Sequence, residues 1–429
     1  MFDSTQIINK VTYNGTSISF PSYNASAPLL EKVLTNTFMA NTITLSGVKY
    51  LGARTTQNFN STTLKVVNLP DCIWMGTSPF PTTPTLTSIS APKLKYLGYM
   101  GDQSPPLVNF PNVEALVGGA NGLLAYNSKV TLVSLPKVNT ISYTGGYAVL
   151  YSCANLSAVY FNGLYNLNLS SGSFIGICPA LTIVELPKLK TFKQIASNGT
   201  PTIINTCNAL ISLNLPNLEL LSNSFYSATT NGIGIVRNCS NLETVSLPNL
   251  KKITGGGTVF ATLPKVTEIS LPNCSYLSID FYMANNCALL SKFYAPNCNY
   301  LYHRSNVAMF SNCPALAEVT LGSQLSYFSG SNMFSGCTAL KSFTFPSTLS
   351  NITGGNIFSG CTSLSQIVLY GLTILTEATV FNNTPLSNST YLGYYGSIYV
   401  PSEYVDMYKV MTNWSLYSDR ITSLENLGG

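Results

Sequence analysis

Residues 178–192, CPALTIVELPKLKTF, contain one complete copy of the pattern that decides the fold. A cysteine lies nine residues before the proline, and apolar residues lie six, three and one before it. The run TIVEL alternates, so its valine and leucine point to one side of a strand while Glu185 points to the other. Pro187 then ends the strand, because proline cannot donate to the middle of a sheet. The segment KLKTF that follows reads as a second short strand or an extended edge.

This pattern recurs along nearly the whole chain, at spacings of 19 to 32 residues and most often 24 to 26. We call the place of Pro187 in each copy the reference position. Asn162, Gly322 and Tyr370 occupy it without proline. One unit cannot bury its own apolar face, but stacked units can, so the period predicts a mainly β solenoid of about fifteen rungs. Glycine runs such as Gly255–Gly257 and Gly354–Gly355 are predicted to be turns that need positive φ. The prolines at the reference position are Pro70, Pro92, Pro111, Pro136, Pro187, Pro216, Pro248, Pro272, Pro296, Pro346 and Pro401.

All eleven cysteines fall at two fixed offsets from the reference position. Three lie two residues after it: Cys72, Cys274 and Cys298. Because cysteine is small and often buried, the columns predict a structural role as reduced core thiols. Disulfides between neighbouring rungs are the alternative, and zinc is disfavoured because no Cys-x-x-Cys pair occurs and the chain has one histidine. The other eight lie nine residues before it: Cys153, Cys178, Cys207, Cys239, Cys287, Cys313, Cys337 and Cys361.

Composition narrows the classes of function. Charged residues make up only 9% of the chain, and the net charge of +5 comes from scattered cations without a basic stripe, which argues against nucleic-acid binding. No apolar stretch is long enough to predict insertion into a membrane. No signal peptide is visible at the N-terminus. A signal could have been removed, export could use another route, or the protein could be assembled inside a cell as a virus component.

The sequence offers few candidate catalytic residues. A Ser-His-Asp or Cys-His site would need His303, which is expected in a surface turn. Glu268 and Glu318 share a column with Lys292 between them, which is better explained as an alternating ion-pair ladder than as a glycosidase pair. The chain is therefore predicted not to be an enzyme and to need no cofactor.

A ligand is expected on the strand face that points away from the core, at positions two and four before the reference. That face is mostly small and polar, and its conspicuous charged and aromatic groups suit a glycan or an extended chain. The candidate ligand-binding residues are Tyr160, Glu185, Glu268, Lys292, Tyr294 and Glu318.

The unit FSGCTALKSFTFPSTLSNITGGNIFSGC, residues 334–361, resembles the BspA-like leucine-rich repeats of bacteria and some protists. The match is closest at 310–370 and recognisable from about residue 60, whereas most earlier units have one residue fewer after the proline. The resemblance implies a right-handed leucine-rich-repeat solenoid that is curved and rich in β-structure. It also implies a surface or secreted protein that adheres to host matrix, to other cells or to glycans.

Three segments are predicted: an N-terminal cap or irregular repeats at 1–50, the solenoid at 51–397, and a C-terminal cap at 398–429. In the cap, Ser402 is a plausible helix N-cap, and Tyr404, Val405 and Tyr408 are spaced to face inward. Trp414 is expected to pack under this helix in a structural role.

The sequence therefore favours a non-catalytic recognition or adhesion protein, secreted or on the cell surface, that binds a protein or glycan ligand on another cell or host matrix. The alternative is a structural or receptor-binding component of a virion or phage tail. A carbohydrate-active enzyme is a third reading, which the single histidine and the scattered acids argue against.

Overall fold

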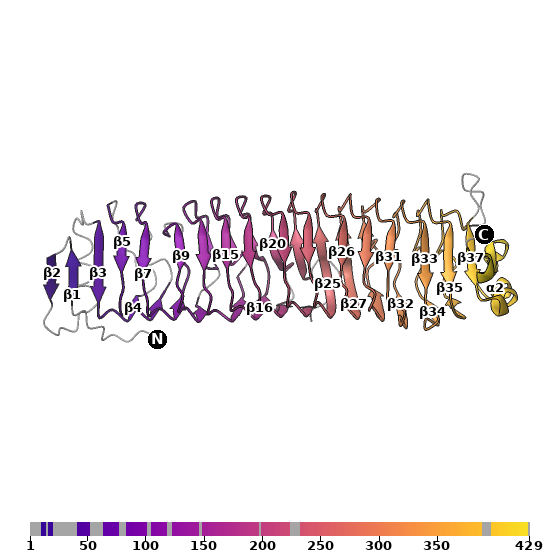
Figure 1. The fold of residues 1–429 in the computed structure, drawn as a ribbon, viewed down its shortest axis with the longest axis horizontal. Helices are drawn as coiled ribbons and strands as arrows, with labels where there is room; N and C mark the ends of the chain where they lie inside the picture. Colours follow the sequence, from indigo (N-terminus) through magenta and orange to yellow (C-terminus); the bar gives the residue numbers. More distant parts are fainter. Residues whose placement is uncertain are drawn as a thin grey trace. The chain divides into compact units, whose positions relative to one another are not determined.

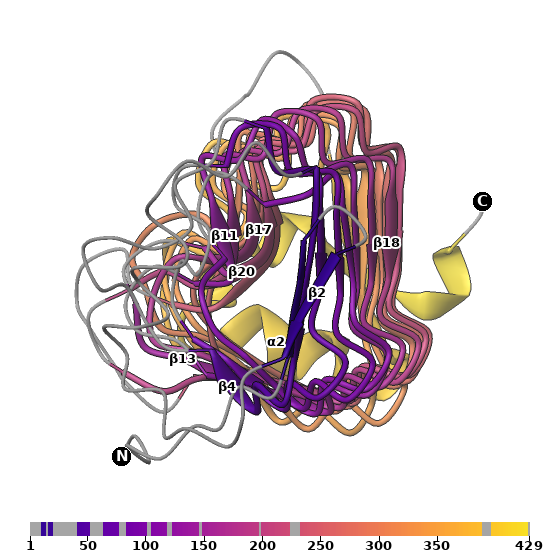
Figure 2. The ribbon, with the colours of Figure 1, turned by 90° about the vertical axis from the view of Figure 1, so that its left-hand side faces the viewer.

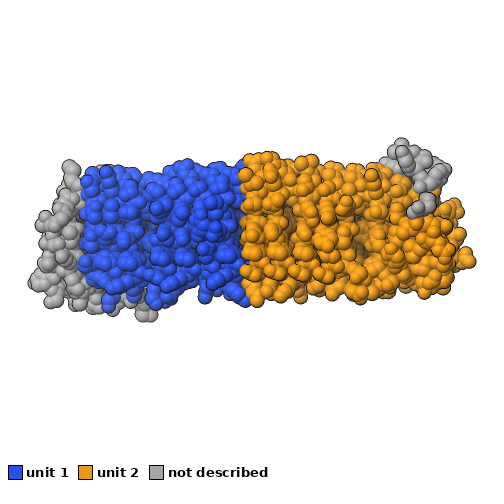
Figure 3. All heavy atoms as spheres, in the orientation of Figure 1, with its two compact units in different colours: residues 1–189, 203–210 blue, residues 190–202, 211–429 orange. Residues whose placement is uncertain are grey.

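The computed structural model describes residues 10–13, 16–19, 41–51, 63–76, 83–100, 104–117, 122–145, 148–196, 199–223, 232–387 and 396–427. The chain divides into two compact units (Figure 3). Unit 1 comprises Met1–Leu189 and Ile203–Leu210, and unit 2 comprises Lys190–Thr202 and Ile211–Gly429.

Each unit is a parallel β-solenoid, and the described residues complete about 13 turns rather than the fifteen expected. A turn holds up to three short strands, which we call first, second and third in chain order. The first strand precedes the reference proline and the second follows it, so the segment after the proline is confirmed as a strand. Strands of one kind stack from turn to turn, as seen along each unit in Figure 1 and end-on in Figure 2.

In unit 1 the turns are preceded by a hairpin of β1 (Lys10–Tyr13) and β2 (Thr16–Ser19), in which β1 pairs antiparallel with both β2 and β3. The first strands are β3 (Thr42–Ser46), β5 (Val66–Asn68), β7 (Ser88–Ser90), β9 (Leu107–Asn109), β12 (Leu132–Ser134), β15 (Ala158–Tyr160) and β18 (Ile183–Glu185). The second strands are β4 (Tyr50–Leu51), β6 (Trp74–Met75), β8 (Tyr96–Leu97), β10 (Ala115–Leu116), β13 (Thr140–Tyr143) and β16 (Asn166–Leu169). The third strands are β11 (Leu124–Ala125), β14 (Leu150–Tyr151) and β17 (Ser173–Gly176), and β20 (Thr202–Asn205) crosses the unit boundary.

Unit 2 repeats this arrangement. Its first strands are β21 (Ser212–Asn214), β24 (Thr244–Ser246), β26 (Glu268–Ser270), β28 (Lys292–Tyr294), β31 (Glu318–Thr320), β33 (Ser342–Phe345), β35 (Gln366–Leu369) and β37 (Ser397–Val400). Its second strands are β19 (Thr191–Gln194), β22 (Leu220–Asn223), β29 (Tyr300–His303), β32 (Tyr327–Ser329), β34 (Asn351–Ile352) and β36 (Ile374–Leu375). The third strands are β23 (Gly234–Arg237) and β30 (Phe310–Ser311), and two long strands, β25 (Lys252–Ala261) and β27 (Tyr276–Asn285), serve as second and third strands together.

The core is built from the columns that the repeat predicts. All eleven cysteines are free and buried. Eight cysteines lie nine residues before the reference position, and the residue before each of them takes a positive φ, for example 53° at Ile177 and 54° at Asn238. The chain therefore turns sharply there. The apolar residues six before the reference position are at most 3% exposed: Leu64, Leu86, Val130, Leu156, Leu181, Leu210, Leu242, Val266, Leu290, Leu316, Leu340 and Leu364.

The prediction of a turn at Gly255–Gly257 is wrong, because these glycines lie inside β25. The pairing of β25 with β27 shifts register on both sides of Gly256. Gly255 still has the expected positive φ of 62°. A Cβ on Gly257 would lie 2.4 Å from the Cα of Gly232, so close contact between two backbones requires glycine here. Gly354 has the predicted positive φ of 118°.

The C-terminal segment contains the 3₁₀ helices η1 (Ser402–Tyr404), η2 (Ser415–Arg420) and η3 (Leu424–Asn426), the short helix α2 (Val405–Val410) and β38 (Ile421–Ser423). Ser402 is not an N-cap: Pro401 precedes η1, and neither η1 nor α2 has a side-chain cap bond. Tyr408 is fully buried, whereas Tyr404 and Val405 are only half-buried. None of the helices in the described part of the chain is long and apolar enough to cross a membrane.

Candidate binding faces

The first face of unit 2, formed by the outward side chains of its first strands, brings four of the six predicted binding residues together. The parallel register of β26, β28 and β31 places Lys292 beside Glu268 on one side and Glu318 on the other. The Lys292 Nζ lies 3.9 Å from Glu268 Oε1 and 5.3 Å from the centroid of the Tyr294 ring. Within the described residues no ion pair joins Lys292 to Glu318, so only half of the expected ion-pair ladder is formed.

The other two candidates, Tyr160 and Glu185, lie in unit 1. They are direct neighbours in the parallel pairing of β15 with β18, with Tyr160 half-buried and Glu185 exposed. The six predicted residues therefore form two separate clusters, one in each unit.

Neither glutamate of the column has the surroundings of a catalytic acid. A glycosidase acid needs an apolar enclosure that keeps its carboxyl protonated. Glu268 and Glu318 are both exposed. The arrangement suits polar and charged contacts with a ligand.

His303 is not a surface turn residue as predicted, because it ends β29 and is only 1% exposed. Its Nδ1 lies 3.0 Å from the carbonyl oxygen of Ser331 and its Nε2 lies 2.8 Å from that of Phe281. Burial lowers the pKa of His303, while the two carbonyls oppose that shift. Its ring ties together the backbone of neighbouring turns and is closed off from a substrate.

The second face of unit 2, formed by the outward side chains of its second strands, carries an aromatic stack that our sequence reasoning missed. Tyr276, Tyr300 and Tyr327 are partners in the pairing of β27, β29 and β32. Their rings are stacked with centroids 4.2 and 4.5 Å apart and with 4° between planes in both pairs. A signal was present: an aromatic residue four after the reference proline recurs at Trp74, Tyr96, Tyr276 and Tyr300.

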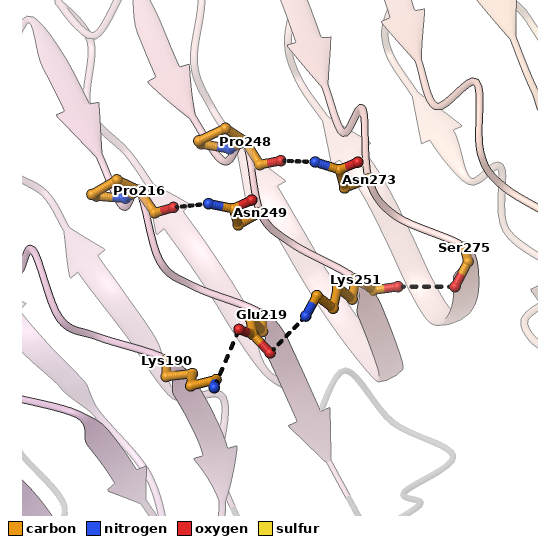
Figure 4. Close-up of polar contacts among 8 residues, drawn as sticks. All are labelled: Lys190, Pro216, Glu219, Pro248, Asn249, Lys251, Asn273 and Ser275. Atoms are coloured by element: carbon orange, nitrogen blue, oxygen red, sulfur yellow. Dashed lines mark hydrogen bonds and ion pairs between the residues drawn. The ribbon is translucent and has the colours of Figure 1, made fainter.

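A charged edge runs between the first and second strands of unit 2 (Figure 4). Glu219 is shared by two lysines, at 3.3 Å from Lys190 Nζ and 3.1 Å from Lys251 Nζ. The hydrogen bond from Lys251 lowers the pKa of Glu219, and Lys190 adds to this effect. Beside this edge, the amides of Asn249 and Asn273 each donate to the proline carbonyl of the preceding turn, at 2.8 Å. These contacts fasten successive turns together and leave Lys251 exposed.

The thiols are held by backbone carbonyls in the core. Cys178 donates to the carbonyl of Gly176 at 3.4 Å, and Cys361 donates to that of Phe334 at 3.0 Å. Burial raises the pKa of Cys298 and of Cys361 to about 12. Because the thiolate is the reactive form, burial makes these cysteines inert as nucleophiles.

We therefore predict that a maleimide reagent labels the native protein very slowly at pH 8. A pKa of about 12 makes the thiolate of Cys361 roughly a thousandfold scarcer than at an unshifted cysteine. Mass spectrometry after timed labelling is the measurement, and all eleven thiols should react once the protein is unfolded in guanidinium. Rapid labelling of the native chain, or failure of the unfolded chain to react fully, would contradict free buried thiols.

Comparisons with known proteins find one repeat family and several solved structures to which the chain is similar. Residues 229–329 and 306–399 match the family described as BspA type Leucine rich repeat region, in six copies. No curated protein matches the sequence. Among solved structures, the chain is similar to a leucine-rich repeat protein from Bacteroides ovatus, with 17% identity, coverage of 97% of this chain and 99% of that one, and a TM-score of 0.32. It is also similar to a leucine rich cell surface protein from Faecalibacterium prausnitzii, with 16% identity, coverage of 88% and 93%, and a TM-score of 0.24.

Proposed function

We propose that this protein, a BspA-type leucine-rich repeat protein by the match over residues 229–399, is a non-catalytic recognition or adhesion protein on the cell surface or secreted from the cell. Its ligand is a host matrix protein, a glycan or another cell. The ligand binds to the first face of unit 2, around Tyr294 and Lys292.

The observation that carries the proposal is the register of β26, β28 and β31. It gathers two carboxylates, one ammonium group and one aromatic ring on adjacent turns. Most other first strands of unit 2 present small polar side chains at the place of Tyr294, such as Asn214, Ser246 and Thr344. Solenoid proteins bind across the extended surfaces that their strands line, and a charged and aromatic group on an otherwise plain surface marks a contact site.

Two further observations support a non-catalytic surface role. The single histidine is committed to backbone carbonyls, which removes the most common general base. A surface of hydroxyl and amide side chains with only 9% charged residues in the chain suits a protein that works outside the cytosol.

The test is binding of the purified chain to an array of glycans and extracellular-matrix proteins. We expect saturable binding to at least one ligand, weakened about tenfold or more by Tyr294→Ala and by Lys292→Glu, because each removes a central contact. Tyr370→Ala and Lys265→Glu are matched controls, since both residues are exposed and lie outside the cluster. Absence of binding, or equal loss with the controls, would contradict the proposal and favour a structural role.

A further inference from the structure

The tyrosine stack on the second face is larger than the fold requires. Leu277, Leu301 and Phe328 supply the buried side of these strands and are at most 1% exposed. At the place of the tyrosines, the other second strands of unit 2 carry no aromatic ring, as at Thr191, Leu220 and Asn351. Tyr276 and Tyr300 are half-buried, and Tyr327 is 41% exposed. Turns of this solenoid therefore form without an outward aromatic ring, and three in register need another explanation.

Cations border this stack. Lys252 is the register partner of Tyr276 on the neighbouring strand, and its Nζ lies 4.5 Å from the centroid of the Tyr276 ring. Tyr302, two residues after Tyr300, packs edge-on against Tyr327 at 6.4 Å. The Arg304 guanidinium lies 5.9 Å from the Tyr302 ring. The stack thus has a cation at one end and another beside it.

Carboxylates at this face are already neutralised. Among the described residues of β25, β27, β29 and β32 the one carboxylate is Asp280, which is 4% exposed and lies 3.7 Å from the Nε of Arg304. On the adjoining edge, Glu219 is shared between Lys190 and Lys251. Positive charge therefore exceeds negative charge around the rings, and the complementary ligand is an anion.

The geometry of the rings decides which kind of anion fits. Rings stacked face to face at 4.2 and 4.5 Å leave no gap for a nucleobase, so the stack is not a platform for single-stranded nucleic acid. What the stack presents outward is a row of ring edges and hydroxyl groups, repeated at the rung spacing of about 4.8 Å. Burial, with a contribution from Tyr276, raises the pKa of Tyr300 to about 12, so its hydroxyl stays a donor at neutral pH.

We propose that Tyr276, Tyr300, Tyr327 and Lys252 form a second binding site, which takes an acidic polysaccharide. Sugar hydroxyls exchange hydrogen bonds with the row of phenol hydroxyls, and the carboxylate or sulfate groups of the polymer pair with Lys252. A repeating polymer engages several turns at once, so weak contacts add up along the row. This site lies on different strands from the proposed site at Tyr294 and does not depend on it.

The test uses the full chain and isothermal titration calorimetry with two acidic polysaccharides, polygalacturonate for carboxylates and heparin for sulfates. We expect binding to at least one of them, weakened about tenfold or more by Lys252→Ala and by Tyr300→Ala, and weakened as well by raising the salt concentration. Tyr300→Phe keeps the ring and removes the hydroxyl, so it should fall between the native protein and Tyr300→Ala. The exposed residues Lys188 and Tyr165 provide the matched controls Lys188→Ala and Tyr165→Ala.

Other outcomes overturn the proposal. Failure to bind either acidic polysaccharide, or equal affinity for dextran, poly-glutamate or poly(dT), would exclude a site specific for acidic polysaccharides. Lys252 is exposed, so Lys252→Ala should leave the thermal midpoint unchanged and remains informative if Tyr300→Ala is unstable. Tyr294→Ala and Lys292→Glu should not affect polygalacturonate or heparin binding, which separates this proposal from the one for the first face.

Discussion

Deletion of residues 398–429 is expected to leave insoluble protein. The deletion removes β38 and nearly all of β37, which bares the paired edge of β35. It also uncovers Phe381, whose ring packs against Tyr417 at 5.3 Å and against Trp414 at 6.1 Å. An unpaired strand edge beside an apolar rung is a template for aggregation, and solenoids need a polar terminal cap for this reason. The measurement is the soluble fraction after expression, and full solubility of the truncated chain would contradict a cap.

A point variant tests the same cap without removing a strand. The Trp414 indole is fully buried, packs edge-on against Tyr408 at 5.2 Å, and donates from Nε1 to the carbonyl of Thr373 at 2.8 Å. Trp414→Ala should therefore lower the free energy of unfolding by about 3–5 kcal/mol. Val410→Ala, at a side chain 79% exposed in the same segment, is the control and should stay within about 0.5 kcal/mol. Equal effects of the two variants in guanidinium unfolding would refute this role for Trp414.

Phe334→Ala is a third change for which we expect a large effect. Phe334 is fully buried and stacks between Phe310 and Phe358, with centroids 5.5 Å away on each side. Phe343 closes the cluster at 5.2 Å from Phe334. Truncation would leave a ring-sized cavity in the middle of a column, so the free energy of unfolding should fall by about 3–5 kcal/mol.

Guanidinium unfolding monitored by circular dichroism measures this loss, provided that the slope of the transition is compared as well. A solenoid can unfold in parts, and a change in slope would show that turns on either side of the defect have separated. Phe334→Leu should cost less than half as much because it restores part of the volume. Leu289→Ala, at a side chain 55% exposed, is the surface control. A loss below about 1 kcal/mol for Phe334→Ala would mean that neighbouring turns collapse into the space.

The residues of the charged and aromatic cluster on the first face could be predicted from the sequence, and the reason is local. Glu268, Lys292 and Glu318 share one offset from the reference position, and β26, β28 and β31 pair without a shift, so equal offsets become neighbouring side chains. The sequence did not show which neighbour Lys292 contacts. In the structure its side chain reaches Glu268 and the Tyr294 ring, and among the described residues it forms no ion pair with Glu318. On the second face, Tyr276 and Tyr300 also share one offset, four after the reference proline, whereas Tyr327 lies five after Gly322 and joins the stack through the pairing of β29 with β32.

The sequence by itself determined the solenoid, its strand before each proline, and the buried columns of leucine and cysteine, because those features follow from offsets inside one repeat. Only the tertiary structure decided the conformation of the segments in which the repeats differ in length. Gly255–Gly257 lie in the ten-residue strand β25 instead of a turn. His303 is buried between the carbonyls of Ser331 and Phe281 instead of lying in a surface turn. The physical reason is that the segments between second and third strands form their hydrogen bonds with the backbone of neighbouring turns. A single repeat does not contain those partners.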